Sequence, residues 1–384
     1  MDKIYYLDNA ATTKVFDEVF DLMKQNNETS FYNPSASYKL ALDSKKNLNS
    51  AREKISSLLR GEKGKLYFTS SATESNNTVF EGVHLRPGDE VLISAGEHPS
   101  VYEAAQRLLK KGVIVKEIPI TKNGKVDTEK YEKLLSNKVV LISVIHVSNE
   151  TGAVNDIRNL VKIAKSFNSR ILFHSDGVQA FGKVKVNLVD LGVDLYTISA
   201  HKIYAPRGIA ALWVKKGTTI DSFLVGGGQE DGFRSSTENV AGAIAFAYAA
   251  QKVVAELENN KQILDSYKKT FLDKILNSEI GKFVTVNSPD DAVSNIVSIS
   301  FDKIKGEVLM YALDGEGVLV SKGSACSSKK AGNRVLDAMG VSQTDIIGSI
   351  RVSFSPYEKY DFDYISKVII SNVCRFENNV IVKK

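Results

Sequence analysis

The chain has 384 residues, more than a single hydrophobic core usually holds, so we expect one large domain and a smaller one. Its 43% hydrophobic and 25% charged residues are typical of a globular protein rather than a disordered or fibrous one. The net charge is +5, and no long basic run is present, so neither feature favours direct nucleic-acid binding.

The first residues, MDKIYYLDNAATT, lack the apolar core of a signal peptide, because Asp2, Asp8 and Asn9 interrupt it. No window offers the roughly 18 consecutive apolar residues of a membrane helix. Two cysteines, Cys326 and Cys374, cannot build a disulfide framework, and no CxxC pair indicates zinc. We therefore expect a cytoplasmic protein without membrane association, with a single bridge between the two thiols as the alternative.

Apolar strands alternate with amphipathic helices between residues 65 and 214. Several strands are nearly continuous apolar runs, as expected where both faces of a sheet are covered. Segments 99–112 and 156–168 have helical patterning. This alternation predicts an α/β domain with a mainly parallel seven-stranded sheet covered by helices. The predicted strands are 65–69, 90–94, 113–120, 139–147, 171–176, 195–199 and 209–214.

Residues 237–278 have the pattern of one long helix or of two broken ones. Beyond them a strand, a helix, a second strand and a second helix follow, which predicts a smaller α+β domain. We expect a large domain of residues 14–258 and a small domain formed by 1–13 and 259–384. The later elements are predicted at 295–301, 306–313, 349–355 and 363–376.

Polar residues follow several strands of the predicted sheet, where open α/β sheets bind their ligands. The first of these turns, Ser70 to Glu74, is rich in hydroxyl groups and opens a helix, so its free backbone N–H groups suit a phosphate. A plain helix N-cap is the alternative. The other polar strand ends are 95–99, 148–152, and Asp176 with Gln179.

Segment 194–208, DLYTISAHKIYAPRG, places Lys202 just past a buried strand. Lysine is almost never buried unpaired, and an amine nucleophile held as a Schiff base would explain its position. A surface lysine is the alternative. Asp176 also ends a strand. A lysine and a carboxylate near one sheet edge predict pyridoxal phosphate, which needs an amine for its aldehyde and an acid for its pyridinium nitrogen.

Nine sequence blocks resemble those of NifS/IscS-like cysteine desulfurases, in the same order, from Tyr6 to beyond Arg351. These enzymes have the fold of type I pyridoxal-phosphate transferases and belong to the class V aminotransferase superfamily. The blocks are YLDNAATT, NPSASY, FTSSATESNN, EHPSV, HVSNETG, HSDGVQAFGK, SAHKIYAPRG, GGGQEDGFRSSTEN and GSACSS.

The resemblance implies a role for each matching residue. Lys202 would bind the cofactor and move protons at the substrate Cα. Asp176 would pair with the pyridine nitrogen, Gln179 with the phenolic oxygen, and His98 would stack on the ring and act as acid or base. The alternative for His98 is a helix N-terminal residue before Pro99. The phosphate would be held by Ala72, Thr73, Ser199 and His201, and by Thr237 of the neighbouring subunit in a homodimer.

The same resemblance implies a reaction. Asn149, which also contacts the cofactor, and Arg351 would bind L-cysteine, because the planar fork of arginine suits a carboxylate. An outward-facing strand charge is the alternative for Arg351. Cys326 would attack the substrate sulfur as a thiolate, releasing L-alanine and keeping a persulfide. An iron–sulfur scaffold or a tRNA-thiolating enzyme would accept the sulfur.

The cations around Cys326 have three interpretations: a field that lowers the thiol pKa, a docking patch for an acidic acceptor, or a solvated face. Other reactions also remain open, namely another aminotransferase or a selenocysteine lyase, as does a non-catalytic scaffold of the same fold. The histidines show no metal-ligand spacing. The cations in question are Lys322, Lys329, Lys330 and Arg334.

Some residues depart from the usual motifs of the family. Ser71, Ser236 and Ala205 replace glycines and lose the freedom of glycine at positive φ, so we expect any deviation in the phosphate pocket and in cofactor affinity. The remaining departures are Tyr38 for His, Gly177 for Ala, Ser148 for Asn and Arg207 for Lys.

Overall fold

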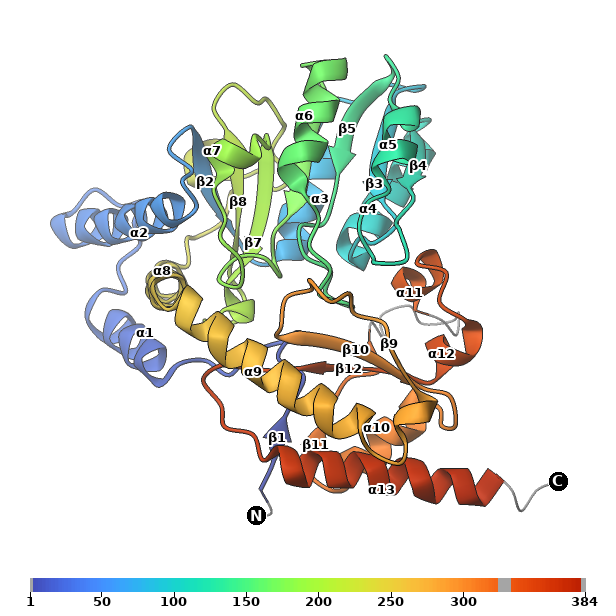
Figure 1. Cartoon of the computed structure of the whole chain (residues 1–384). Helices are drawn as coiled ribbons and strands as arrows, with labels where there is room; N and C mark the ends of the chain where they lie inside the picture. The colour runs from blue at the N-terminus through green and yellow to red at the C-terminus, as the bar shows by residue number, and fades with distance from the viewer. Residues whose placement is uncertain (1–2, 324–332, 381–384) are drawn as a thin grey trace.

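The computed structural model describes residues 3–323 and 333–380 of the chain. Figure 1 shows two layered parts, an upper one around a large sheet and a lower one around a small sheet. Helices α8 (Val240–Ala255) and α9 (Leu257–Leu276) lead from the upper part into the lower one. Each part has its own large hydrophobic core, as expected for a chain of this length.

The upper part contains the predicted seven-stranded sheet, with strand order β2-β8-β7-β6-β5-β3-β4. Six strands run in the same direction, and β8 is antiparallel to its neighbours β2 and β7. The prediction of a mainly parallel sheet is therefore confirmed. The strands are β2 (Gly64–Thr69), β3 (Glu90–Ser94), β4 (Ile114–Ile118), β5 (Val139–Ser143), β6 (Leu172–Asp176), β7 (Leu195–Ser199) and β8 (Ala210–Lys215).

Helices cover both faces of this sheet, so alternate side chains of one strand enter different cores. On β3, Val91 and Ile93 join the core beneath α3 and α4, whereas Leu92 joins the core beneath α2, α6 and α8. This burial on both faces explains the continuous apolar runs in the sequence. The covering helices are α2 (Lys39–Leu58), α3 (Ala72–Gly82), α4 (Pro99–Leu108), α6 (Ile157–Phe167) and α8.

Helices α1 (Asp17–Thr29) and α2 are additions to the elements predicted from the sequence. The buried side chains of α2 recur every three or four residues and form one face. Both helices pack against α8 and form the left-hand edge of the molecule in Figure 1. The buried residues of α2 are Ala41, Ser44, Leu48, Ala51 and Ile55.

The lower part is built on a three-stranded antiparallel sheet with order β12-β10-β9, packed against α9, α10 and α13. The N-terminal residues belong to this core, because β1 pairs with β11 and Leu7 is completely buried there. The elements are β1 (Tyr5–Tyr6), β9 (Val284–Val286), β10 (Ile296–Phe301), β11 (Val318–Leu319), β12 (Ser349–Ser353), α10 (Gly306–Asp314) and α13 (Phe362–Val380).

The segment predicted as one long helix or two broken ones is two helices, α8 and α9, joined at Glu256 with a bend of 70°. Among the residues described here, no single helix is long and apolar enough to cross a membrane, and this bent pair meets the test only as a pair. The domain division at residue 258 would fall in the first turn of α9 and stays a prediction.

The remaining elements are short and connect the larger ones. They are α5 (Thr128–Leu134), α7 (Leu188–Leu191), α11 (Arg334–Ala338), α12 (Gln343–Ile347), and the 3₁₀ turns η1 (Leu109–Lys111), η2 (Ala200–Lys202), η3 (Glu230–Gly232) and η4 (Gly281–Phe283).

Candidate active site

Most predicted site residues lie where strands of the large sheet end. The carboxyl ends of strands that run in one direction meet at the same edge of a sheet, so these side chains converge there. They are Ala72 and Thr73 after β2, His98 after β3, Asn149 after β5, Asp176 at the end of β6, Gln179 soon after it, and Ser199, His201 and Lys202 at the end of β7 and in η2.

Lys202 is held through its amine by the N-terminal segment. Its Nζ donates hydrogen bonds to the carbonyl oxygens of Ala10 (2.7 Å) and Ala11 (2.6 Å). Burial, aided by the positive charge of Arg351, lowers the pKa of Lys202 to about 8, against the effect of nearby carboxylates. Such an amine loses its proton close to neutral pH, which a nucleophilic lysine requires.

Gln179 shares an acceptor with this lysine, because its Nε2 donates to the Ala10 carbonyl at 2.8 Å. Gln179 is buried, and its Oε1 has no hydrogen-bond partner within the part of the chain that the structure describes. Buried side-chain oxygens in proteins are nearly always hydrogen-bonded, so a bound ligand is expected to supply the donor. The phenolic hydroxyl group of a pyridoxal ring would supply one, so this residue fits the cofactor.

Asp176 is buried at the end of β6 and is held by two donors. Its Oδ2 accepts from Asn76 Nδ2 at 2.9 Å, and its Oδ1 accepts from the backbone N–H of Val178 at 3.0 Å. A buried carboxylate held in this way suits the pyridinium nitrogen of the cofactor.

The turn after β2 has the features of a phosphate site. Ser71 is the N-cap of α3, and its side chain accepts from the backbone N–H of Glu74 at 3.2 Å. The first N–H groups of a helix have no acceptor within it, so those of Ala72 and Thr73 are available to an anion. The cap uses the N–H of Glu74, whereas a phosphate would use those of Ala72 and Thr73, so the two interpretations are compatible.

Ser199 is buried at the end of β7, and His201, two residues later, lies beside the N-terminal segment. The ring Nδ1 of His201 is 3.2 Å from Thr12 Oγ1, and its backbone oxygen accepts from the N–H of Thr13 at 3.1 Å. Burial, aided by Lys202, lowers the pKa of His201 to about 4. The ring is therefore neutral at neutral pH and would bind a phosphate by a hydrogen bond rather than by charge.

His98 is the N-cap residue of α4, and its Nδ1 accepts from the backbone N–H of Ser100 at 3.1 Å. Burial lowers the pKa of His98; Asp176 opposes this effect and Lys202 adds to it. The capping role and the predicted role at the cofactor are compatible, because the cap uses only Nδ1.

Arg351 on β12 is buried and faces the other predicted residues, so the alternative of an outward-facing strand charge is wrong. Its guanidinium donates to Asp8 Oδ1 (2.8 Å) and to the backbone oxygen of Asn149 (2.9 Å). Glu150 Oε1 lies 3.6 Å away. The Nε of Arg351 has no partner among the described residues. The structure thus brings the two predicted substrate-binding residues into contact.

Thr237 stands apart from this group. It is exposed between η3 and α8, and no hydrogen bond joins it to the other predicted residues that the structure describes. Two bidentate ion pairs hold its segment: Arg234 contacts Glu74 at 2.7 and 3.1 Å, and Arg52 contacts Glu230 at 2.6 and 2.8 Å. The segment is therefore fixed on its own subunit while Thr237 stays accessible.

Cys326 lies outside the described residues, but both flanks of its segment are placed. Asn333, the N-cap of α11, donates to Glu150 Oε2 at 2.7 Å. Gly323 has φ 91°, and a Cβ there would lie 2.6 Å from the same oxygen. Both flanks therefore meet at Glu150, the neighbour of the predicted substrate-binding pair.

Residues that the sequence analysis did not assign also belong to this site. Asp8 and Glu150 contact the guanidinium of Arg351, and Asn76 and Ser100 contact Asp176 and His98. Asn76 lies one helical turn after Ala72, on the same face of α3, which is a signal that could have found it.

Two of the three positions where the family usually has glycine do not adopt a positive φ in this chain, so the freedom of glycine is not needed there. Ser71 has φ −163°, an extended conformation open to any residue. Ala205 is not among the residues with positive φ; its neighbour Tyr204 is, at 66°. Ser236 has φ 159°, at the extended end of the positive range.

Gly177, in contrast, is required by its surroundings. A Cβ at this position would overlap the ring of Tyr196 on β7. Tyr196 is completely buried, and its hydroxyl group is 2.8 Å from His146 Nδ1. The buried ring therefore occupies the space that an alanine methyl would need.

Gly177→Ala is expected to lower the free energy of unfolding by about 1–3 kcal/mol, because it overpacks this site. Denaturant unfolding measures the effect. Tyr196→Leu removes the ring, so the double variant should be more stable than the sum of the two single losses predicts. Additive losses would contradict the proposed overlap.

Comparisons with known proteins agree over nearly the whole chain. The aminotransferase class-V family model matches residues 5–361. A cysteine desulfurase IscS of Dictyoglomus turgidum is 37% identical over 375 residues, which cover 96% of this chain and 94% of that protein. A cysteine desulfurase IscS of Methanosarcina thermophila is 34% identical, with 98% of this chain and 94% of that protein covered.

Solved structures have the same fold. A NifS-like protein matches with a TM-score of 0.90 and 31% identity, covering 97% of this chain and 100% of that one. SspA in complex with cysteine matches with a TM-score of 0.80 and 28% identity, covering 92% of this chain and 99% of that one.

Proposed function

Because the chain belongs to the aminotransferase class-V family, we propose that it is a cysteine desulfurase, which converts L-cysteine into L-alanine and an enzyme-bound persulfide. One observation carries the proposal. Asp176 and Lys202 follow the neighbouring strands β6 and β7 of the large sheet, and Arg351 on β12 of the small sheet is near enough for its charge to lower the pKa of Lys202, so a carboxylate, an amine and a guanidinium face the same region.

Pyridoxal phosphate, when bound, supplies the electron sink for bond breaking at the substrate. Lys202 would hold its aldehyde carbon and Asp176 its ring nitrogen. Gln179 would contact its phenolic oxygen, and Asn149 would also contact the cofactor. The phosphate would be bound by the N–H groups of Ala72 and Thr73, by Ser199, and by His201.

The substrate would be oriented by Arg351, whose planar fork can pair with a carboxylate, and by Asn149. Lys202 would move the proton at the substrate Cα once its amine is free, and His98 would move a second proton. Arg351 is already fixed by Asp8 and by the Asn149 backbone, so little side-chain freedom is lost on binding.

Cys326 is the proposed sulfur acceptor of the first step. Its thiolate would form a new S–S bond as the Cβ–S bond of the substrate breaks. The two described residues that flank its segment, Gly323 and Asn333, both lie against Glu150, whose side chain is 3.6 Å from that of Arg351.

Cys326→Ala tests the proposal. The variant is expected to keep the yellow absorbance of the bound cofactor but to form no persulfide from L-cysteine, because the attacking sulfur is gone. Alkylation and peptide mass spectrometry detect the persulfide, and amino-acid analysis detects alanine. Cys374→Ala is the matched control and should retain both products. Undiminished sulfide release by Cys326→Ala, or a keto acid in place of alanine, would reject this function.

We also propose a homodimer in which Thr237 reaches the phosphate of the neighbouring subunit. Thr237 is accessible on a segment that ion pairs hold in place, as the role requires. Five large hydrophobic side chains lie exposed between residues 20 and 42, and exposed apolar surface of this kind suits burial against a second subunit. They are Phe20, Phe31, Tyr38, Leu40 and Leu42.

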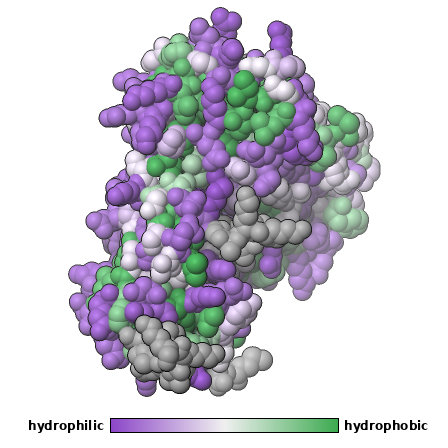
Figure 2. All heavy atoms as spheres, turned by 90° about the vertical axis from the view of Figure 1, so that its right-hand side faces the viewer, coloured by the Kyte–Doolittle hydropathy of each residue, from purple (hydrophilic) through white to green (hydrophobic). Residues whose placement is uncertain are grey.

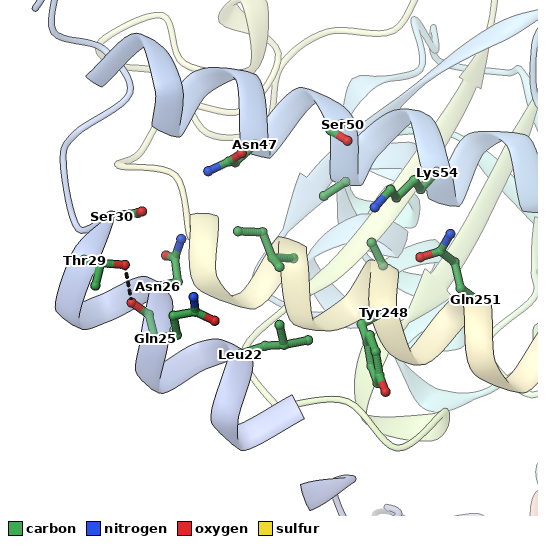
Figure 3. Close-up of a pocket in the computed structure, with 13 residues that line it drawn as sticks. Leu22, Gln25, Asn26, Thr29, Ser30, Asn47, Ser50, Lys54, Tyr248 and Gln251 are labelled. Carbon is green, nitrogen blue, oxygen red and sulfur yellow. Dashed lines mark hydrogen bonds between the residues drawn. The ribbon is translucent and has the colours of Figure 1, made fainter. Parts of the chain in front are cut away.

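A pocket of about 340 Å³ between α1, α2 and α8 lies on the same side of the molecule (Figure 3). Its labelled side chains are mostly polar, with Asn26 and Lys54 directed into the space between the helices. None of the predicted catalytic or cofactor-binding residues lines it. We therefore assign this pocket to the proposed interface rather than to the reaction.

The persulfide would pass to an acceptor protein, an iron–sulfur scaffold or a tRNA-thiolating enzyme. Figure 2 shows the face that bears α11 and α12, where hydrophilic side chains predominate, as suits a transient partner. On this side the guanidinium of Arg334 is hydrogen-bonded within the protein, since it donates to the Ala95 carbonyl at 2.8 Å. The interpretation of a solvated face therefore does not apply to this cation. A thiol that must stay reduced supports a cytoplasmic location.

A further inference from the structure

Three hydrogen bonds connect Asp176 to His98 across two helices. Asn76 on α3 uses Nδ2 twice, donating to Asp176 Oδ2 at 2.9 Å and to Ser100 Oγ at 2.8 Å. Ser100, in the first turn of α4, places its Oγ 2.8 Å from His98 Nδ1. Asn76 is completely buried and Ser100 is nearly so, so water does not replace these bonds.

The acceptor at one end determines the direction of every bond in this row. Asp176 accepts through its carboxylate oxygen, so the Asn76 amide presents its NH₂ group and has one N–H left for Ser100. Because Ser100 Oγ accepts from Asn76, its own proton points to His98 Nδ1. The backbone N–H of Ser100 also donates to this nitrogen, at 3.1 Å. Two donors at one nitrogen require that Nδ1 carries no proton.

We infer that Asn76 and Ser100 are positioning residues that hold His98 in the neutral tautomer with its proton on Nε2. The inference depends on the proposed function only for what His98 does, not for its tautomer. With Nδ1 engaged, Nε2 is the nitrogen left to exchange a proton, and it already carries one. His98 therefore enters the reaction as a proton donor and must release a proton before it can accept one.

The charges around His98 fit this state. A second proton on Nδ1 would face two donors and the positive end of α4. Burial, Lys202 and Arg351 disfavour the imidazolium, whereas Asp176 and Glu150 favour it, and the net effect lowers the pKa of His98. The neutral ring is therefore the resting form, and the row of hydrogen bonds selects between its two tautomers.

The experiment is ¹⁵N NMR of protein labelled at its histidine nitrogens, both with and without bound pyridoxal phosphate. The chain has five histidines, and the His98 signals are assigned by their loss in His98→Gln. In the wild type we expect an unprotonated Nδ1 and a protonated Nε2. Ser100→Ala leaves only the backbone N–H of residue 100 at Nδ1, so the Nδ1–H tautomer should become detectable beside the Nε2–H form. Ser100→Thr, which restores a hydroxyl group, should return the ring to the Nε2–H form alone. Alanine formation should fall about tenfold in Ser100→Ala and recover in Ser100→Thr.

A protonated Nδ1 in the wild type would overturn the inference, whatever the activity of the protein. So would Nδ1 and Nε2 signals of Ser100→Ala that are identical to those of the wild type, because the lost hydroxyl donor would then have no effect on the ring. A wild-type Nε2–H tautomer in a protein that makes no alanine would support the inference and reject the proposed function instead. If Ser100→Ala does not fold, the wild-type spectrum and Asn76→Ala decide the question.

Discussion

Replacing Lys202 with alanine should lower the rate of L-alanine formation by roughly 10³-fold or more, because the variant loses both the amine that holds the cofactor and a proton carrier. Burial has already lowered the pKa of this amine to about 8, so it is poised for both tasks. Steady-state alanine production measures the effect, and the cofactor absorbance reports how much cofactor remains bound.

Lys183 offers a matched control, because it is a second partly buried lysine beside the first. Its Nζ lies 3.4 Å from the backbone oxygen of Lys202, and burial, aided by Lys202, lowers the pKa of Lys183 to about 7. The lower pKa alone would favour Lys183 as the nucleophile, because more of its amine is unprotonated at neutral pH. Nearness to Asp176 and Arg351 favours Lys202 instead. Borohydride reduction and peptide mass spectrometry should find the cofactor on Lys202, also in Lys183→Met. A cofactor on Lys183 would show the assignment to be wrong.

The second large effect is expected at Arg351. Arg351→Gln should raise the KM for L-cysteine about 10- to 100-fold, since hydrogen bonds to charged groups are worth about 1.5–3 kcal/mol. The change also leaves Asp8 and the buried Glu150 without their cation, so the free energy of unfolding should fall by about 3–5 kcal/mol. Steady-state kinetics and denaturant unfolding measure the two effects separately.

Lys165 separates binding from stability in this experiment. It forms a close ion pair with the buried Asp194, at 2.5 Å, outside the group of predicted site residues. Lys165→Met should therefore destabilise the protein without a comparable change in KM. If both variants raise KM to the same extent, the effect of Arg351 is structural and its role in substrate binding is refuted.

The strands of the large sheet could be predicted because burial on both faces leaves a continuous apolar signature. The predicted strand 139–147 overshoots, since β5 ends at Ser143. Val144, Ile145 and Val147 are buried but belong to the loop beneath the site, and an apolar run does not distinguish a strand from a buried loop. Helix α2 was missed because its buried face includes Ser44 among many polar neighbours, which weakens the periodic signal.

The site could be predicted where its residues follow strands in the local sequence, as for Asp176 and Lys202. Its supporting contacts could not, because they join distant segments. Asp8 and Arg351 are 343 residues apart in the sequence, and no local sequence pattern around either residue predicts their contact. Ser100 lies two residues after His98, yet its effect on the ring depends on Asn76 from another helix.

The N-terminal segment has a consequence for how the protein is made. Its carbonyl groups hold Lys202, while Asn9 and Ala10 are bound to Ser353 on β12, across sequence separations of 344 and 343 residues. A ribosome releases the first residues long before β12 exists, and closing so long a loop is slow. The large sheet can form during synthesis, but the lysine reaches its final setting only after nearly the whole chain has emerged. The hydrogen bonds that hold the lysine amine thus belong to the last stage of folding, after β12 has emerged.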